Sequence, residues 1–176
     1  SFMDQILTAL TETQKAELIR RLHERGGEVR QTLLEEARNL LKDVDSHEVA
    51  EEIFMDLDMI QVETLWDNSG PTRDGYISPE GEALELMEEE LEPHVEQVWD
   101  YLQLDMQAEA RTYLQGILLG LYRFEHESGS EFKDWAVDIP INLFGAFLDK
   151  WREKTGKYSR KTEIDAFCLQ MCPKWM

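Results

Sequence analysis

The chain has 176 residues, of which 42% are hydrophobic and 31% charged, and its formal net charge is −19. Because this length and apolar content suffice for one hydrophobic core, we expect a single helical domain over residues 1–176. A surface this acidic repels the phosphates of nucleic acids and of anionic lipids. We therefore expect no direct binding to nucleic acid or to a membrane.

The first part of the chain predicts three helices. Apolar residues recur here, as elsewhere, at every third or fourth position, and the alternation typical of β-strands is nearly absent, which predicts an all-α fold. A short helix is expected over residues 4–10. Thr11 and Gln14 then match a capping box for a second helix, which ends at Gly26. Residues 29–41 carry the apolar stripe of a third helix.

A longer helix is predicted from Ser46, a good N-cap residue, to Trp66. It is followed by the one long interruption of the helical pattern, residues 67–79, where we expect a long inter-helix loop. The next helix begins with Ser-Pro-Glu at 78–80, which places an N-cap, a proline and an acidic residue where each is favoured. Pro93 predicts a break or kink in that helix.

The most apolar stretch, residues 106–124, predicts a central helix. Gly116 and Gly120 lie one turn apart within it, and a glycine inside a helix costs about 1 kcal/mol relative to alanine, so we expect another backbone to pack closely there. Further helices are predicted over 139–156 and 159–171. Short connections favour a multi-helix orthogonal bundle of antiparallel helical hairpins. A short α-solenoid of the HEAT or TPR kind is the alternative, although no fixed repeat is present.

The 67–82 segment contains candidate ligands for a cation. Residues 74–78 resemble the middle of a calcium-binding EF-hand loop, but Gly81 stands where that loop requires a bidentate glutamate. An ordinary turn, with Tyr76 and Ile77 packed on the core, explains the same residues. If Ca²⁺ or Mg²⁺ binds, making the protein a cation-dependent regulator, the expected ligands are Asp67, Ser69, Asp74 and Glu80. We expect no other cofactor.

An enzyme with its site at the same loop is a further alternative. Its polar groups would be Asp67, Arg73, Asp74 and Tyr76. The chain contains no complete catalytic motif, and its histidines are scattered among exposed polar neighbours, with His94 one helical turn from Glu90. Cys168 and Cys172 are expected to be reduced thiols rather than a disulfide or a zinc site.

Location is predicted from what the chain lacks. The longest uncharged apolar run, residues 116–122, is too short to span a bilayer, and the N-terminus shows no signal-peptide pattern. Ser1 and Phe2 precede Met3 and are expected to be a tag remnant. No N-glycosylation site occurs, and we therefore expect a cytoplasmic protein.

The acidic charge is concentrated in residues 43–138, which carry 26 acidic but only four basic side chains. Such a surface attracts basic partners. Our leading hypothesis is a protein-protein interaction module that acts through this surface, with the candidate interaction residues Glu82, Glu85, Glu88, Glu89 and Glu92. Residues 150–161 carry six basic side chains and are expected to dock on the acidic region, either within one chain or between two in a homo-oligomer.

Overall fold

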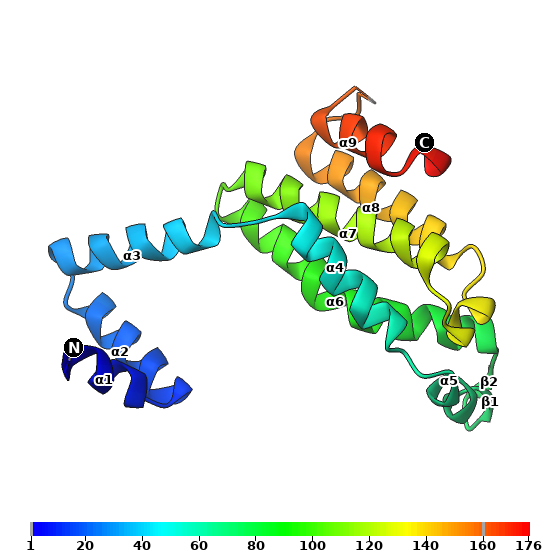
Figure 1. Ribbon diagram of the computed structural model, residues 1–176, viewed down its shortest axis with the longest axis horizontal. Coiled ribbons are helices and arrows are strands. Elements are labelled where there is room, and N and C mark those ends of the chain that lie inside the picture. Colours follow the sequence, from blue (N-terminus) through cyan, green and yellow to red (C-terminus); the bar gives the residue numbers. More distant parts are fainter. Residues whose placement is uncertain (1, 160) are drawn as a thin grey trace. The chain divides into compact units, whose positions relative to one another are not determined.

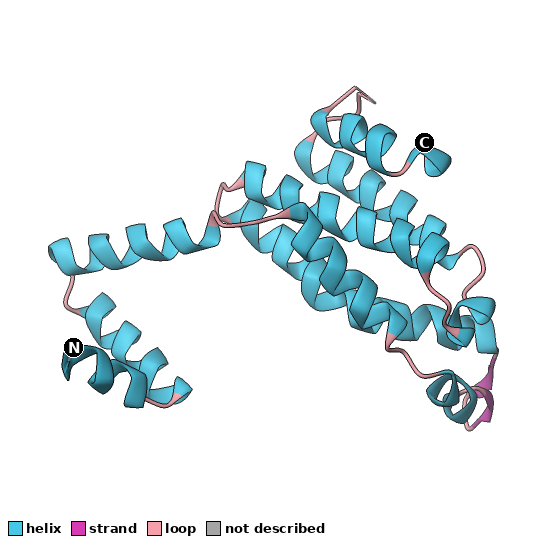
Figure 2. Ribbon diagram, in the orientation of Figure 1, coloured by secondary structure: helices cyan, strands magenta, loops and turns pink. Residues whose placement is uncertain are grey.

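A computed structural model describes residues 2–159 and 161–176, and this part of the chain contains nine α-helices, one two-stranded sheet and two short 3-10 helices (Figure 1 and Figure 2). The all-α prediction is confirmed, because 78% of the structure is helical. Ser1, half of the expected tag remnant, and Arg160 lie outside the described residues. None of the described helices is both long enough and apolar enough to cross a membrane.

The contacts between residues divide the chain into an N-terminal unit, residues 1–43, and a C-terminal unit, residues 44–176. The length and composition of the chain predict one domain over residues 1–176. The difference has a physical basis, because every side chain that is buried within the described residues belongs to the C-terminal unit. The hydrophobic core therefore lies in that unit alone.

The N-terminal unit consists of α1 (Phe2–Ala9), α2 (Glu12–Glu24) and α3 (Gly27–Leu41). The predicted capping box is confirmed at the start of α2. Thr11 Oγ1 accepts a hydrogen bond from the Gln14 amide at 3.2 Å, and Gln14 Oε1 accepts one from the Thr11 amide at 3.0 Å. Gly26 turns the chain into α3 with a φ of +68°, a value that glycine adopts without strain.

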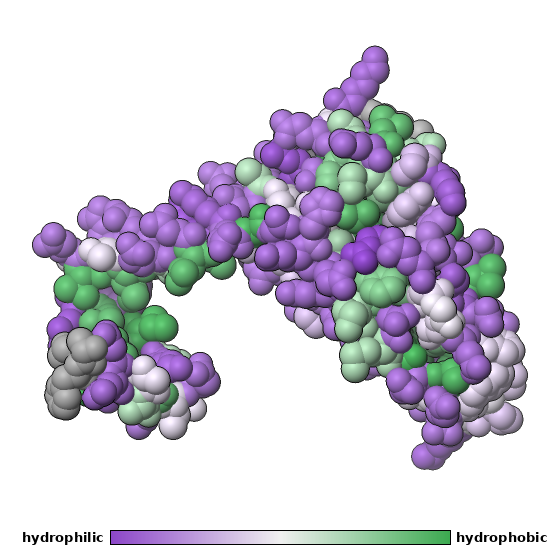
Figure 3. Space-filling view, viewed as in Figure 1, coloured by the Kyte–Doolittle hydropathy of each residue, from purple (hydrophilic) through white to green (hydrophobic). Residues whose placement is uncertain are grey.

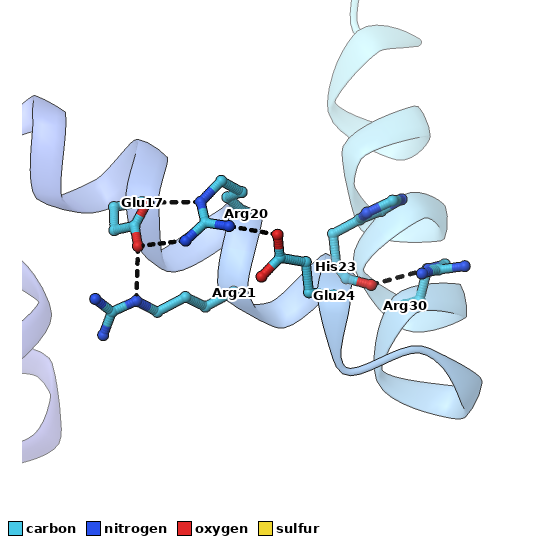
Figure 4. Close-up of polar contacts among 6 residues, drawn as sticks. All are labelled: Glu17, Arg20, Arg21, His23, Glu24 and Arg30. Carbon is cyan, nitrogen blue, oxygen red and sulfur yellow. Dashed lines mark hydrogen bonds and ion pairs between the residues drawn. The ribbon is translucent and has the colours of Figure 1, made fainter.

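Exposed charges line the polar side of α2 (Figure 4). Glu17 accepts hydrogen bonds from Arg20 at 2.7 Å and from Arg21 at 2.8 Å, and these two guanidinium groups lower the pKa of Glu17 to about 2. Arg20 also pairs with Glu24 one turn further on. Arg30 of α3 donates to a carbonyl in the last turn of α2 at 2.9 Å. Because ion pairs this exposed contribute little stability, they do not replace a core.

The C-terminal unit is built around α7. It consists of α4 (Ser46–Asp58), α5 (Val62–Asn68), β1 (Gly70–Thr72), β2 (Gly75–Ile77), α6 (Pro79–Gln103), α7 (Gln107–Glu127), η1 (Glu131–Trp135), α8 (Ile139–Thr155), α9 (Glu163–Met171) and η2 (Pro173–Trp175). Helices α4, α6, α8 and α9 all pack against α7. The interior side chains of α7 are at most 1% exposed, and they include Leu114, Ile117, Leu118, Leu121 and Phe124. The predicted central helix is confirmed.

Residues 67–79 are not the long loop that the sequence predicts. Helix α5 continues to Asn68, and β1 and β2 then form an antiparallel hairpin in which Pro71 pairs with Tyr76. The two-residue turn between the strands is Arg73 and Asp74. Strands of three residues are too short to show an alternating pattern, which explains why they were not predicted.

Two further helix boundaries differ from the prediction. The helix expected over residues 46–66 is interrupted after Asp58, at a point where the sequence has no glycine or proline to indicate a break. By contrast, α6 runs through Pro93 without ending, so the break, one of the two predicted effects of this proline, does not occur. The predicted start of α6 is confirmed, because Ser78 Oγ accepts a hydrogen bond from the Gly81 amide at 3.0 Å.

The two glycines of α7 lie where α4 packs against it. A Cβ atom added at Gly116 would lie 2.5 Å from Val49 Cβ and 2.8 Å from the Ser46 carbonyl oxygen. One added at Gly120 would lie 2.5 Å from Ile53 Cβ. Real Cβ atoms do not approach other atoms so closely, so only glycine permits this contact. The predicted close approach of another backbone is confirmed, and that backbone is α4.

We predict that Gly116→Ala destabilises the protein by about 1–3 kcal/mol, because the added methyl group overpacks the contact with α4. This loss exceeds the gain of about 1 kcal/mol that alanine brings to a helix. Gly145→Ala in α8 is the matched control, since nothing lies within 4 Å of the added atom, and it should be neutral or stabilising. Urea denaturation followed by circular dichroism measures both changes. An equal response of the two variants would contradict the packing argument.

Candidate functional site

A cleft of about 780 Å³ lies along α6 in the C-terminal unit. Four elements contribute to it, namely the end of α5, strand β2, helix α6 and helix α8. Its lining residues are Asn68, Ile77, Glu82, Glu85, Leu86, Glu88, Glu89, Leu91, Glu92, Val95 and Phe147. All five glutamates that the sequence analysis selected as interaction residues therefore border one cavity.

The helical repeat of α6 explains this arrangement. Glu82, Glu85, Glu89 and Glu92 are spaced by three, four and three residues, so they follow one side of the helix. The fully buried residues Ala83, Met87 and Val98 lie on the opposite side and face the core. The core contacts of α6 thus leave its acidic side in the cleft.

Glu82 differs from the other four glutamates. Its side chain is only 5% exposed, and its Oε1 accepts a hydrogen bond from Asn68 Nδ2 at 2.9 Å. It ties the end of α5 to the first turn of α6, and this corrects its prediction as a surface interaction residue. The remaining four, Glu85, Glu88, Glu89 and Glu92, are exposed and make no hydrogen bond or ion pair with other residues in the described part of the chain. We call these four the free glutamates.

Apolar side chains share the cleft with the free glutamates. Leu86 and Val95 of α6 and Phe147 of α8 line it and are half-buried. Ile77 of β2 is half-buried too. The cleft therefore offers apolar surface beside unpaired negative charge, which is the chemistry of a site for a molecule that is both cationic and amphipathic.

The residues predicted to bind a cation are not brought together. Asp67, Asp74 and Glu80 are exposed, and among the residues that the structure describes no three His, Cys, Asp or Glu side chains are placed to hold a metal ion. Asp74 lies in the hairpin turn, whereas Asp67 and Glu80 lie in the helices at its base. Strands of three residues separate the turn from the base by about 10 Å. The hydroxyl of Ser69 donates instead to the Trp66 carbonyl at 3.4 Å.

The four residues of the enzyme alternative do not line the cleft on α6. These residues, Asp67, Arg73, Asp74 and Tyr76, are all exposed, and the cleft is lined by their neighbours Asn68 and Ile77 instead. The side chain of Tyr76 is 70% exposed, which also corrects the prediction that it packs on the core.

His94 forms a polar bridge that sequence reasoning missed. Its Nε2 lies 2.9 Å from Asp56 Oδ2 of α4, and its Nδ1 lies 2.9 Å from the Tyr113 hydroxyl of α7. Its side chain is 14% exposed, so the prediction that it lies among exposed residues is wrong. The partners are 38 and 19 residues away, and no local pattern indicates them.

The chemistry of this bridge favours a structural role. Burial, reinforced by the nearby carboxylate of Glu52, raises the pKa of Tyr113 to about 12. The hydroxyl therefore keeps its proton at neutral pH and can donate to His94 Nδ1. In the tautomer that carries its hydrogen on Nε2, the imidazole then donates to Asp56. A carboxylate, an imidazole and a hydroxyl in series resemble a catalytic relay, but a hydroxyl with a raised pKa is a poor nucleophile.

Part of the basic segment 150–161 contacts α6 in the same chain. The Nζ atoms of Lys150 and Lys154 lie 5.3 Å and 5.2 Å from the centroid of the Trp99 ring, within the range of a cation–π interaction. Arg152 pairs with Asp165 of α9 at 2.8 Å. These residues meet an aromatic ring and α9, and not the glutamates of the cleft.

The two cysteines are free and buried. Burial raises the pKa of both Cys168 and Cys172 to about 12. Because the thiolate is the reactive form, neither cysteine is placed to act as a nucleophile or a redox sensor.

We predict that His94→Ala lowers the free energy of unfolding by about 1–3 kcal/mol, because it removes two hydrogen bonds and leaves the half-buried Tyr113 hydroxyl without its partner. His47→Ala is the control, since His47 is exposed on α4, and its effect should stay within about 0.5 kcal/mol. Guanidinium denaturation compares them. Equal small effects would show that the bridge contributes nothing to stability.

The raised thiol pKa values predict slow reaction of both cysteines with thiol reagents in the folded protein. At pH 8 the folded state holds a thiolate fraction about 1,000-fold below that of the unfolded chain, whose thiols titrate near 9. Reaction with Ellman's reagent should release almost no chromophore in buffer and two equivalents in guanidinium. Prompt labelling of the folded protein would contradict the burial of these residues.

Comparisons of the chain with protein families, with characterised proteins and with solved structures found no match.

Proposed function

We propose that the protein is an interaction module whose cleft on α6 binds a basic, amphipathic helical segment of a partner protein. The observation that carries this proposal is the combination, in one cavity of about 780 Å³, of four free glutamates with half-buried apolar side chains. A purely acidic surface would support only non-specific attraction of cations. The apolar surface adds a requirement that small cations do not meet.

The charge of the free glutamates supports a basic partner. They make no ion pair within the described part of the chain, so a partner's Lys or Arg side chains need not displace an existing contact. The C-terminal unit as a whole carries 29 acidic and 11 basic side chains, a net charge of −18. This field steers basic molecules toward the surface and raises their association rate at low salt.

The dimensions support a helical segment. Glu85 and Glu92 lie two turns apart, which corresponds to about 10 Å along α6. A partner helix that presents basic side chains at positions i, i+3 or i+4 and i+7 covers the same length. Its apolar side would then face Leu86, Val95 and Phe147, which separates this mode of binding from the neutralisation of a charged surface.

Action in the cytoplasm belongs to the same proposal. The two free thiols, Cys168 in α9 and Cys172 directly after it, suit a compartment in which cysteines stay reduced.

The test uses a designed helical peptide of about 15 residues, with lysines on one side and leucines on the other, labelled for fluorescence anisotropy. We predict that Glu89→Gln weakens its binding by about 2- to 5-fold, as expected for one exposed ion pair. Glu90→Gln is the matched control, because Glu90 is exposed on the same helix but does not line the cleft. Binding should weaken as salt is added.

A second variant tests the contribution of the apolar side chains in the cleft. Phe147→Ala should weaken binding of the same peptide by about 10-fold without changing its salt dependence. A peptide that keeps the lysines but has its leucines replaced by serines should bind more weakly and should not respond to Phe147→Ala. Equal effects of the Glu89 and Glu90 variants, or no binding of the amphipathic peptide, would refute the proposed function.

A further inference from the structure

The N-terminal unit carries apolar side chains that nothing in that unit covers. None of the residues of α2 and α3 is buried. Large apolar side chains from all three helices are between 42% and 78% exposed, namely Ile6, Leu7, Ile19, Val29, Leu34 and Leu40. We call these six residues the exposed apolar set. Figure 3 shows such side chains in green, gathered along one side of α3.

Each of the two longer helices has separate apolar and polar sides. In α2, Leu18, Ile19 and Leu22 lie away from the stripe of Glu17, Arg20, Arg21 and Glu24, whose ion pairs stay in water (Figure 4). In α3 the apolar residues recur from Val29 to Leu41. This pattern is typical of helices that bury one side, yet no described residue of the unit is buried.

A unit of this size does not stabilise itself in that state. Chains near 40 residues bury too little surface to fold alone, and those without disulfides or metals use oligomerisation. Both cysteines lie in the C-terminal unit, and no metal-ligand cluster occurs among the described residues. Contiguous exposed apolar surface of this kind marks an association site.

The charge of the N-terminal unit favours a second copy of the chain as its partner. The N-terminal unit has seven basic and eight acidic side chains, a net charge of −1, whereas the C-terminal unit carries −18. Two N-terminal units can therefore approach with little mutual repulsion, although the rest of the molecule repels its copy. A second copy also supplies an apolar surface of the same pattern, as a two-fold symmetric interface requires.

We propose that the N-terminal unit is a self-association module, in which the α2–α3 hairpins of two copies pack their apolar sides together. Two helical hairpins joined in this way form a four-helix arrangement with Ile19, Val29, Leu34 and Leu40 in its core. The exposed apolar set is then covered, and the ion pairs of α2 remain on the outside. This dimer does not depend on the acidic cleft, and it would present two clefts to a partner.

Sedimentation equilibrium of the full chain from 1 to 100 µM tests the proposal. The wild type should show a mass of about 41 kDa, twice that of the 20.6 kDa chain. Leu34→Lys should raise the dissociation constant of the dimer by about 10-fold or more, because it places a charge in the interface. Asn39→Lys adds the same charge at an exposed polar position of α3 and should leave the dimer intact.

Salt distinguishes this dimer from one held by the basic segment 150–161 against the acidic region of a second copy. An apolar interface between acidic molecules should be unchanged or tightened from 0.05 to 0.5 M NaCl, since salt screens their repulsion. The wild-type measurement requires no variant to fold. A wild-type mass of one chain at every concentration, a dimer that survives Leu34→Lys, or a dimer that dissociates in salt would each overturn the proposal.

Discussion

The close approach of α4 to α7 is the contact on which the rest of the C-terminal unit depends. Gly116 and Gly120 have no side chain on the side of α7 that contacts α4. The side chains of Val49 and Ile53 of α4 therefore pack against the backbone of α7. Protein interiors are packed so densely that a single added methyl group at such a point has to move a helix. With α4 in this position, Asp56 lies within hydrogen-bonding distance of His94 of α6. His94 in turn contacts the Tyr113 hydroxyl of α7 and so completes the polar bridge. That bridge connects α4, α6 and α7, while the acidic side of α6 remains in the cleft.

The sequence predicted those structural features that depend on residues close to one another in the chain. The capping box at Thr11, the start of α6 at Ser78 and the close packing at Gly116 were all predictable, because each depends on a few neighbouring residues or on one chemical property. The interruption after Asp58 was not predictable, since no breaker residue marks it. His94 was misplaced for a related reason, because its surroundings are made by helices distant in sequence.

The acidic part of the candidate site could be predicted from the sequence. A run of glutamates on one helix indicates an acidic surface, and the five selected residues do border the cleft. The apolar half was not visible, because Phe147 comes from α8 and joins the cleft only through tertiary packing. Burial of Glu82 was hidden as well, since its partner Asn68 lies beyond the hairpin. The grouping of the cation-binding candidates could not be judged from the sequence, because the hairpin places Asp74 away from the carboxylates at its base.

Pro93 has a consequence for the surface around it. Proline has no amide hydrogen, so the carbonyl oxygen of Glu89, which a regular helix would satisfy from position 93, lacks that donor. Pro93 is exposed and follows the same side of α6 as Glu82 and Glu89. The acidic side of α6 thus includes a neutral main-chain acceptor next to its charged side chains. Main-chain oxygens keep their hydrogen-bonding capacity at any pH and ionic strength, so a donor that reached this oxygen would form a contact that salt does not screen.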